Sequence, residues 1–406
     1  MKNIDVVMPG SLFQTIGPVG TLKRIISNRD FFLSNNLDIT VFNGNYYKTK
    51  DDLVDDGKVQ KSNSLKSKIV SALQVRAKKS FLLSLFFVEY NQKVYKSFVK
   101  KYLQQQRNPD IIVFHDYLTC YWYFKLKKDK PSKTAMFIHS DCIPLKMEML
   151  YYPIIKGTWY EKKMLYRYSF SIEKVDRICC ICEAGKRNIN ELYPNTQSKT
   201  SLVINGITDL SNSERELVAS IKKERTDGII KLCCVGSVSV RKAQRLVIKA
   251  LALLSDEDRK RYHLTVIGNG PDLEYCNQLI IDNNLYEQVS LIGAVPNKDV
   301  YKYLAASDIF VLLSENEGLP ISIIEAMRAG LAIISTNVSG IPELVSNNNG
   351  LLIAPNEKEL ANVLRERGKY NWKEMGEASR QLFEQKFRFD RMREDYVNMI
   401  NSLFNA

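Results

Sequence analysis

Two glutamates, Glu317 and Glu325, flank the start of a predicted helix in the stretch ENEGLPISIIEAM at 315–327. The apolar run before it predicts a buried strand, Pro320 can open the helix as its first residue, and Gly330 can end it. A helix start attracts anions, phosphate above all. Carboxylates accept hydrogen bonds from vicinal hydroxyls, as in a sugar or ribose. The pattern therefore fits a nucleotide sugar, and dipole-favoured acids on a solvated loop are the alternative.

Cations and histidines follow other predicted strands. Arg241 and Lys242 lie in the loop of VGSVSVRKA at 235–243, where two cations could neutralise a diphosphate leaving group. His139 follows a further strand, and His115 ends an earlier one. A solvated basic loop and structural histidines are the alternatives.

The elements that must position these residues alternate along both halves of the chain. Short, continuously apolar runs separated by helix-period segments indicate parallel sheets covered on both faces. Ligands bind outside the carboxyl ends of such strands. We therefore expect an α/β fold of two doubly wound, Rossmann-like domains facing across a cleft, with the join near 203–207. The predicted strands are Ile4–Met8, Leu37–Phe42, Ile111–His115, Thr134–His139, Arg177–Cys182, Ile230–Gly236, His263–Gly268, Val289–Gly293, Ile309–Leu313 and Leu331–Ser335.

Length and composition agree with a globular protein of two domains. The chain has 406 residues, 45% of them hydrophobic and 25% charged. Neither a signal peptide nor an apolar run long enough to span a membrane is recognisable. The eight cysteines include clusters inside strand-like runs, where neighbouring side chains point to opposite faces. We expect these cysteines to be small buried hydrophobic residues of a protein in the reducing cytoplasm, and we expect them to form no metal site.

The positive charge is concentrated in the first half of the chain. Residues 1–200 carry 33 Lys and Arg against 18 Asp and Glu, whereas residues 201–406 carry 25 against 27. This asymmetry predicts an anionic partner. No nucleic-acid module is recognisable, so we expect no nucleic acid.

One segment of that basic half is a candidate for membrane contact. The run Phe81–Val88 is almost wholly apolar and has Lys78, Lys79 and Lys93 beside it. This composition fits a segment that rests on an anionic bilayer, as in a peripheral protein at the inner face of the cell membrane. A core-packing helix with solvated lysines is the alternative.

The stretch at 315–327 resembles the signature of the retaining GT-B glycosyltransferases of family 4. Further segments agree: VIGNGP, VSLIGAV, YLAASDIFVLLS, SGIPELV, NGLLI, ICEAGKRNI and VINGIT. The segment FRFDRMREDYVNMI at 387–400 resembles the family's closing helix, which crosses back to the first domain. The resemblance covers most of 175–400 and is weaker before residue 110.

The family resemblance implies that the two domains bind different substrates. Residues 1–204 would bind the acceptor, together with a crossing helix at about 386–406. Residues 205–385 would bind the nucleotide sugar, most simply a UDP-sugar, as co-substrate without a metal. The acceptor would be a glycan or a lipid-linked glycan of the cell envelope or capsule.

The resemblance also implies a role for each matching residue. Glu325 would bind the donor ribose, Glu317 would bind hydroxyls of the transferred sugar, and Lys242 would bind the diphosphate. His139 would lie near the transferred sugar. The backbone amides of Gly318, Leu319 and Ile321, which follows Pro320, would contact the sugar and the diphosphate. The backbone around Ala294 and Val295 would contact the base. A first-domain loop with Gly17 and Gly20 would lie near the phosphates or the acceptor.

The chain departs from the family pattern at several positions. Ser237 stands where an Arg is common, and Arg241 could compensate. Ala243 replaces a usual Gly, Pro320 removes one amide donor, and the first-domain double glycine is split. These differences bear on the choice of donor more than on the reaction class.

The resemblance implies a front-side transfer with retention, in which the leaving phosphate takes the acceptor proton. The acidic run at 256–258 follows a helix rather than a strand, so we expect no metal there. Two other classes remain open: a nucleotide-sugar epimerase or hydrolase with the same fold, and a non-catalytic basic binding protein.

Overall fold

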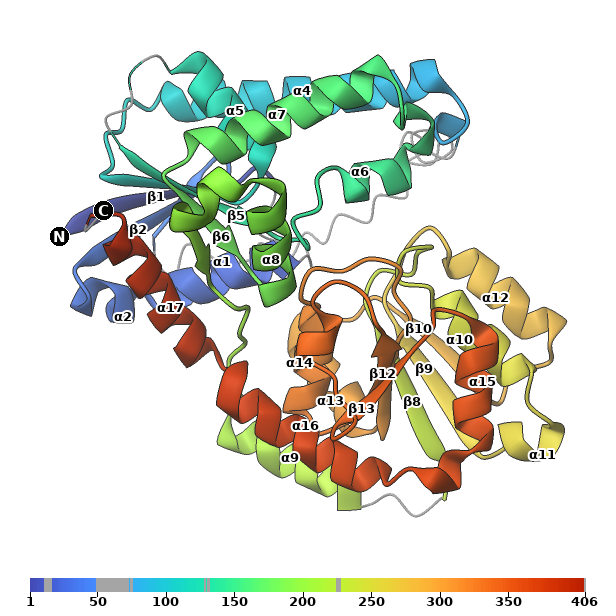
Figure 1. Ribbon diagram of the computed structural model, residues 1–406. Helices are drawn as coiled ribbons and strands as arrows, with labels where there is room; N and C mark the ends of the chain where they lie inside the picture. Colours follow the sequence, from blue (N-terminus) through green and yellow to red (C-terminus); the bar gives the residue numbers. More distant parts are fainter. Residues whose placement is uncertain are drawn as a thin grey trace. The chain divides into compact units, whose positions relative to one another are not determined.

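A computed structural model describes residues 1–10, 17–48, 73, 76–127, 129, 132–223 and 228–404. It divides the chain into two compact units. The first unit comprises Met1–Val203 with Asp395–Ala406, and the second comprises Ile204–Glu394. Each unit is an α/β sheet with helices on both faces (Figure 1). The predicted fold class, two doubly wound α/β units, is confirmed.

The first unit is built on a seven-stranded sheet in the order β3-β2-β1-β4-β5-β6-β7. All neighbouring strands are parallel except the short β3, which pairs antiparallel with β2. The sequence predicted five of these strands and missed the two edge strands, whose few residues give little periodic signal. The strands are β1 (Lys2–Val7), β2 (Leu37–Phe42), β3 (Tyr46–Tyr47), β4 (Ile111–Phe114), β5 (Lys133–Ile138), β6 (Arg177–Cys180) and β7 (Thr200–Leu202).

Helices of the first unit pack on both faces of this sheet. The helices α4, α5 and α7 cover one face, where Phe42, Tyr102, Tyr123 and Tyr168 share one apolar cluster. On the opposite face, the ring of Tyr396 in α17 stacks on Phe137 of β5 with centroids 5.6 Å apart. The helices are α1 (Gly17–Ser27), α2 (Arg29–Ser34), α4 (Phe81–Leu103), α5 (Tyr117–Leu126), α6 (Lys146–Tyr151), η2 (Pro153–Ile155), α7 (Trp159–Lys174), α8 (Glu183–Leu192), η3 (Pro194–Lys199) and α17 (Phe389–Ser402).

The second unit is built on a six-stranded, fully parallel sheet in the order β10-β9-β8-β11-β12-β13. The sequence predicted five of these strands within one or two residues. The sixth strand, β13, lies in the segment NGLLI, which resembles the family but was not predicted to be a strand. The strands are β8 (Ile230–Val235), β9 (Tyr262–Ile267), β10 (Val289–Gly293), β11 (Ile309–Leu312), β12 (Ala332–Thr336) and β13 (Gly350–Ile353).

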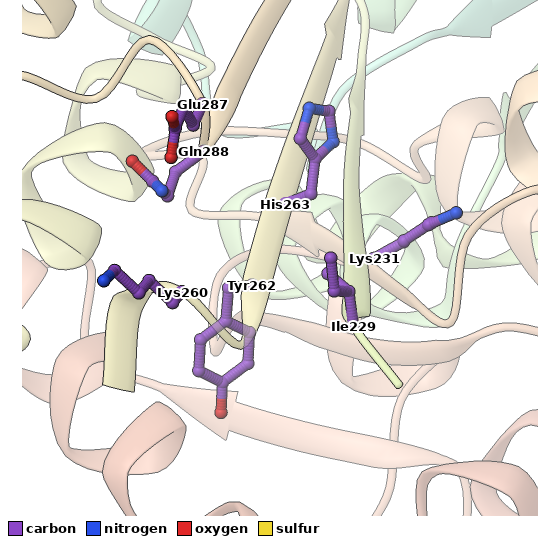
Figure 2. Close-up of a pocket in the computed structure, with 7 residues that line it drawn as sticks. All are labelled: Ile229, Lys231, Lys260, Tyr262, His263, Glu287 and Gln288. Carbon is purple, nitrogen blue, oxygen red and sulfur yellow. The ribbon is translucent and has the colours of Figure 1, made fainter. Parts of the chain in front are cut away.

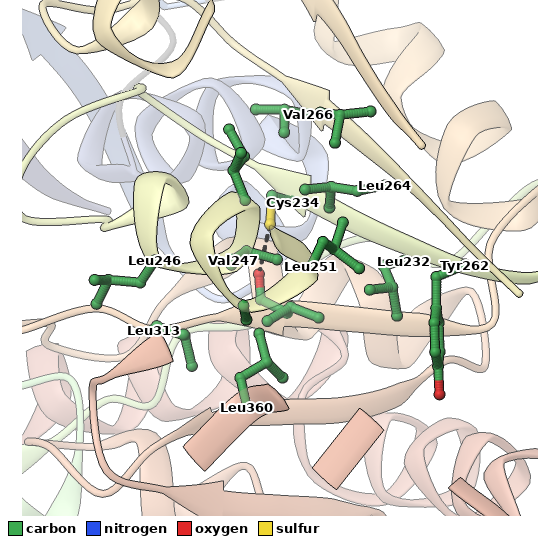
Figure 3. Close-up of a cluster of buried hydrophobic side chains, with 14 of the residues drawn as sticks. Leu232, Cys234, Leu246, Val247, Leu251, Tyr262, Leu264, Val266, Leu313 and Leu360 are labelled. Carbon is green, nitrogen blue, oxygen red and sulfur yellow. Dashed lines mark hydrogen bonds between the residues drawn. The ribbon is translucent and has the colours of Figure 1, made fainter. Parts of the chain in front are cut away.

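The core of the second unit lies beneath the helix α10, as Figure 3 shows. Leu246, Val247 and Leu251 of this helix pack on strand residues such as Leu232 and Leu264. These apolar contacts fix α10 and the loop before it on the sheet. The helices of the unit are α9 (Asn212–Lys223), α10 (Gln244–Ala252), α11 (Asp256–Arg259), α12 (Leu273–Asp282), η4 (Asn297–Asp299), α13 (Val300–Ala305), α14 (Ile321–Arg328), η5 (Ile341–Glu343), α15 (Glu357–Arg365), η6 (Arg367–Lys369) and α16 (Trp372–Lys386).

The second unit begins and ends in two segments that lie side by side. The Ile207 amide donates to the Phe387 carbonyl, and the Phe389 amide donates to the Ile207 carbonyl, each at 2.9 Å. A Cβ on Gly206 would lie 2.5 Å from the Arg388 carbonyl oxygen, so this position requires glycine. The segment predicted as the join is therefore held by backbone pairing.

All eight cysteines are free and buried, which confirms the prediction that they are small buried hydrophobes. The Cys234 thiol, for example, donates to the Val311 carbonyl within the core at 3.1 Å. In the helices that the structure describes, none combines the length and the apolar character that a membrane crossing needs.

Candidate active site

The candidate site lies at the carboxyl ends of the strands of the second unit. Here the loops after β8 and β9 approach so closely that a Cβ on Gly268 would lie 1.9 Å from the Gly236 carbonyl oxygen. The Val238 amide donates to the Asn269 carbonyl at 3.1 Å, which ties the two loops together. This pairing holds the loop that carries Arg241 and Lys242.

A buried carboxylate joins that loop to the one after β11. Glu317 Oε1 lies 2.8 Å from Arg241, 2.8 Å from Lys242 Nζ and 2.8 Å from the Ser314 hydroxyl that donates to it. The Arg241 guanidinium also donates to the Asn316 carbonyl at 3.0 Å. The structure thus brings Glu317, Lys242 and Arg241 together, and we call these three residues the ion cluster.

The electrostatics of the ion cluster keep Glu317 charged although only 8% of its surface is exposed. Burial by itself would raise the pKa of Glu317. The cations of Lys242 and Arg241, with hydrogen bonds from Lys242 and Ser314, outweigh burial and hold this pKa below its ordinary value. Both cations and the Ser314 hydroxyl contact Oε1 of this carboxylate.

The start of α14 lies next to the ion cluster in the chain. Pro320 occupies the position before the helix rather than its first residue, because its backbone is extended at ψ 116°. No side chain caps the helix start. The Ser322 hydroxyl in the first turn is buried and has no hydrogen-bond partner within the described residues. A buried donor of this kind beside free helix amides is suited to an anion.

Three further residues predicted for the donor site surround this helix start. Leu319 and Pro320 have buried side chains, while Gly318 is partly exposed. The Gly318 carbonyl accepts from the Gly340 amide at 3.0 Å, which anchors the turn to the loop after β12. The amide of Ile321 follows directly in the chain.

The other predicted donor residues lie farther along the same unit. Glu325 is in the second turn of α14 and is partly exposed. Ala294 and Val295 follow β10, and two strands, β9 and β8, separate β10 from β11 in the sheet. The structure therefore places the predicted base contact at a different strand end from the ion cluster.

Two histidines meet at the strand ends of the first unit. His115 Nδ1 and His139 Nε2 are 2.9 Å apart, directly after β4 and β5. Burial lowers the pKa of His139 to about 4, and burial followed by the nearby His139 lowers the pKa of His115 well below its ordinary value. Both rings are therefore neutral at physiological pH. Nothing in the local sequence indicates that the two would touch.

The glycines predicted for a first-domain loop are not in a loop. Gly17 and Gly20 both lie in the first turn of α1. The expectation was wrong because helix start signals are weak where glycine and proline are interleaved. Residues 11–16, which precede them, lie outside the described residues.

The acidic run at 256–258 forms the short helix α11, capped by the Ser255 hydroxyl. Its acids pair with Arg259, Arg261 and Arg367. Across the part of the chain that the structure describes, no group of three or more His, Cys, Asp or Glu side chains could hold a metal ion.

A hollow of the second unit lies elsewhere. A cavity of about 370 Å³ is lined by residues at the amino ends of β8, β9 and β10. Lys231, Tyr262 and His263 are among the lining residues drawn in Figure 2. Because ligands of parallel sheets bind at the opposite, carboxyl ends of the strands, this cavity is not the candidate site.

Sequence reasoning missed two residues and one contact of this chemistry. Ser314 holds the Glu317 carboxylate, Ser322 presents an unpartnered hydroxyl, and His115 contacts His139. Ser314 and Ser322 lie next to the glutamates in the chain and could have been noticed by position. Their hydrogen bonding could not, since it depends on rotamers set by packing.

Comparisons with known proteins agree with this arrangement. The family described as "Glycosyl transferases group 1" matches residues 193–382. The chain is similar to the phosphatidylinositol N-acetylglucosaminyltransferase GPI3 subunit of Saccharomyces cerevisiae, with 27% identity over 198 residues that are 48% of this chain and 42% of the yeast protein. It is also similar to the amylovoran biosynthesis glycosyltransferase AmsK of Erwinia amylovora, with 33% identity over 133 residues, 31% of this chain and 32% of that protein. The chain thus spans less than half the length of these two relatives.

A solved structure extends the likeness to the whole fold. Anabaena Alr3699/HepE in complex with UDP matches with a TM-score of 0.66 over 99% of this chain and 100% of that one, at 14% identity. Identity this low shows the fold alone. Residues 193–382 thus match the glycosyl transferases group 1 family, and the structural likeness shows that the fold of the whole chain is that of the Anabaena protein.

Proposed function

We propose that this chain is a retaining hexosyltransferase that moves a sugar from a UDP-sugar to a glycan or lipid-linked acceptor. The observation that carries the proposal is the ion cluster beside the uncapped start of α14. Two cations, an anion-binding helix end and a buried, charged carboxylate match a diphosphate bonded to a sugar. The UDP complex of the Anabaena structure supports the choice of base.

In this proposal the ion cluster and α14 hold the donor. Lys242 and Arg241 face the diphosphate, and the Ser322 hydroxyl adds a hydrogen bond to a phosphate oxygen. Glu317 positions both cations through Oε1 and accepts from a sugar hydroxyl through Oε2. Glu325 accepts from the ribose hydroxyls, as the family resemblance implies.

The reaction then depends on charge. Breaking the bond between the anomeric carbon and the diphosphate oxygen builds negative charge on the departing group, which Lys242, Arg241 and the α14 start stabilise. The acceptor hydroxyl oxygen bonds to the same face of the sugar, and its proton passes to the leaving phosphate. The cations supply the stabilisation, so the proposed reaction proceeds without a metal. His139, neutral at physiological pH, offers a hydrogen bond to the transferred sugar.

The acceptor class follows from the relatives and from charge. The yeast relative is named for transfer to phosphatidylinositol, and the Erwinia relative for synthesis of the polysaccharide amylovoran. The basic first half of this chain suits an acceptor that carries phosphate or lies at an anionic surface. We place the proposed reaction in cell-envelope or capsular polysaccharide synthesis, at the cytoplasmic face of the membrane.

A thermal-shift screen of the full chain against nucleoside diphosphates and their sugars tests the donor site. UDP should raise the melting temperature more than the other diphosphates do, with and without a chelator, and Glu325→Ala should weaken UDP binding about tenfold. A conservative Glu325→Asp control should weaken it less. Absence of any shift with every nucleotide would overturn the proposal, and product analysis with and without an acceptor separates transfer from hydrolysis or epimerisation.

A further inference from the structure

The helix α4 of the first unit is apolar on two sides. Its inner side carries the buried residues Ser84, Phe87, Val88, Gln92, Val99 and Tyr102. Its outer side carries Leu82, Phe86, Tyr90 and Val94, which recur every four residues and so lie along one line of the helix. We call these four outer residues the α4 stripe. A helix on the surface of a globular unit normally presents polar residues there.

The α4 stripe is exposed to an unusual degree. Leu82 is 77% exposed, Phe86 63%, Tyr90 58% and Val94 45%, and Leu82 exceeds every other large apolar residue described. The rings of Phe86 and Tyr90 stack on each other with centroids 6.4 Å apart, outside the core. Contiguous exposed apolar side chains mark an interaction surface rather than a solvated face.

The charges around the α4 stripe are almost all positive. Lys78 and Lys79 are exposed just before the helix, and Lys93, Lys100 and Lys101 are exposed farther along it. The helix contains one acid, Glu89. That acid is bonded by the Tyr160 hydroxyl and by Lys163 and Arg167 of α7, which lies alongside α4 (Figure 1).

The helix α7, which contacts α4 through Glu89, carries an exposed aromatic residue. Trp159 adjoins Tyr160 in α7 and is 62% exposed. Trp and Tyr favour the interface between lipid and water because their rings are apolar with one polar atom. Apolar side chains between flanking lysines complement a surface that has both an oily interior and anionic headgroups.

We infer that the α4 stripe, with its flanking lysines, docks the first unit on an anionic lipid bilayer. Leu82, Phe86 and Val94 enter the boundary between headgroups and acyl chains, and Lys78, Lys79 and Lys93 contact the headgroups. The inference deepens the proposed function, on which it rests for its biological purpose: a bilayer-docked first unit would meet a lipid-linked acceptor where that acceptor resides. Its physical basis, however, is the stripe and its charges.

Flotation of the full chain with vesicles tests the docking surface. One vesicle set contains only phosphatidylcholine, and the other contains equal parts phosphatidylcholine and phosphatidylglycerol. The wild-type chain should float with the anionic set and at most weakly with the neutral set. The double variant Leu82→Ser/Phe86→Ser and the charge variant Lys78→Glu/Lys79→Glu should each bind the anionic vesicles about tenfold or more weakly.

Matched variants in the second unit serve as controls. Tyr286, which is 63% exposed, and Leu253, which is 44% exposed, give the double variant Leu253→Ser/Tyr286→Ser with a similar loss of exposed apolar surface. This control should float like the wild type. Equal flotation of the Leu82→Ser/Phe86→Ser variant and the wild type would overturn the inference, as would a wild type that does not float.

Two additional measurements distinguish a bilayer from a second copy of the chain, and docking from donor binding. Light scattering that shows a dimer of the wild type and a monomer of Leu82→Ser/Phe86→Ser would assign the stripe to a second copy and overturn the bilayer inference. A UDP thermal shift on every variant reports the donor site. Flotation lost with the UDP shift retained supports the inference, whereas flotation retained by a wild type that binds no nucleotide leaves docking intact and overturns the proposed function.

Discussion

The strand ends of the two units handle buried polar groups in opposite ways. In the second unit, two cations keep the buried Glu317 ionised and lower its pKa. In the first unit, burial raises the pKa of Asp116 to about 6, against hydrogen bonds from Thr119, and it drives His115 and His139 to their neutral forms. The second unit therefore presents fixed charge, suited to a diphosphate, and the histidines of the first unit are neutral hydrogen-bonding groups, suited to sugar hydroxyls.

The strongest challenge to this contrast is removal of a cation from the ion cluster. Lys242→Ala should slow release of the nucleoside diphosphate from a bound nucleotide sugar about 100-fold, because the departing charge loses one preorganised partner. Turnover at saturating donor measures this loss.

A neighbouring cation provides the matched control for Lys242→Ala. Arg245 pairs with Glu315 at 3.3 Å and with Asp272 at 4.0 Å rather than with Glu317. Arg245→Ala should therefore change turnover less than about threefold, since ion pairs of this kind contribute little. Equal effects of the two variants would show that general positive charge, and not the ion cluster, supports the reaction.

The variant Glu317→Gln tests whether the second unit really depends on a charged acid. It should lower the free energy of unfolding by about 2 kcal/mol at neutral pH, because Lys242 and Arg241 lose their counter-charge. Because the pKa of Glu317 is lowered in the folded state, its ion pairs contribute to stability at neutral pH. This contribution disappears as the pH falls through the pKa of Glu317 in the folded protein. The difference in denaturant midpoint between wild type and variant should therefore shrink in acid, and a constant difference would contradict the assignment.

The neutrality of the first unit's histidines predicts a smaller, pH-independent effect. His139→Asn should slow transfer about tenfold, the value of one hydrogen bond, and the ratio of wild-type to variant rates should stay flat from about pH 6 to about pH 8. His263, which bonds Ser290 in the second unit, gives the control His263→Asn with unchanged rate. A rate ratio that inflects near the ordinary histidine pKa would show that His139 acts as a cation.

The smallest expected effect is at Asp116, and its sign is opposite to that at Glu317. A raised folded pKa means that ionisation of this carboxyl costs stability above about pH 6, a cost that vanishes as the pH falls and the proton binds. Asp116→Asn retains an oxygen that can cap the helix, and it should raise the free energy of unfolding by about 1 kcal/mol at alkaline pH. The expected effect is small because the residue is partly exposed to solvent. Urea unfolding at two pH values checks it, and destabilisation by the variant would refute the contrast.

Local patterns were sufficient for most of the fold. Continuous apolar runs predicted ten of the thirteen strands, since a strand buried on both faces has little choice of composition. The missed strands β3 and β7 are short edge strands whose residues carry no alternation. The helical start at Gly17 was missed because its signal is mixed with turn residues.

Ala243 illustrates a departure that only the structure explains. It stands where the family usually has glycine, and its backbone adopts the left-handed conformation at φ 52° directly before α10. A non-glycine residue bears a steric cost there, which surrounding packing must offset. The sequence showed the substitution, and the structure shows the conformation that it must tolerate.

The sequence by itself determined the α/β class, the division into two units and the identity of the acids and cations near the helix start, because these depend on local composition and spacing. The tertiary structure alone decided that Glu317 binds Arg241 and Lys242, that His115 touches His139, and that the α4 stripe faces outward. The two contacts join residues from separate loops, and the exposure of the α4 stripe depends on which side of α4 packs against the unit. Their energies arise from burial and from distances between charges, which exist only once the chain has packed.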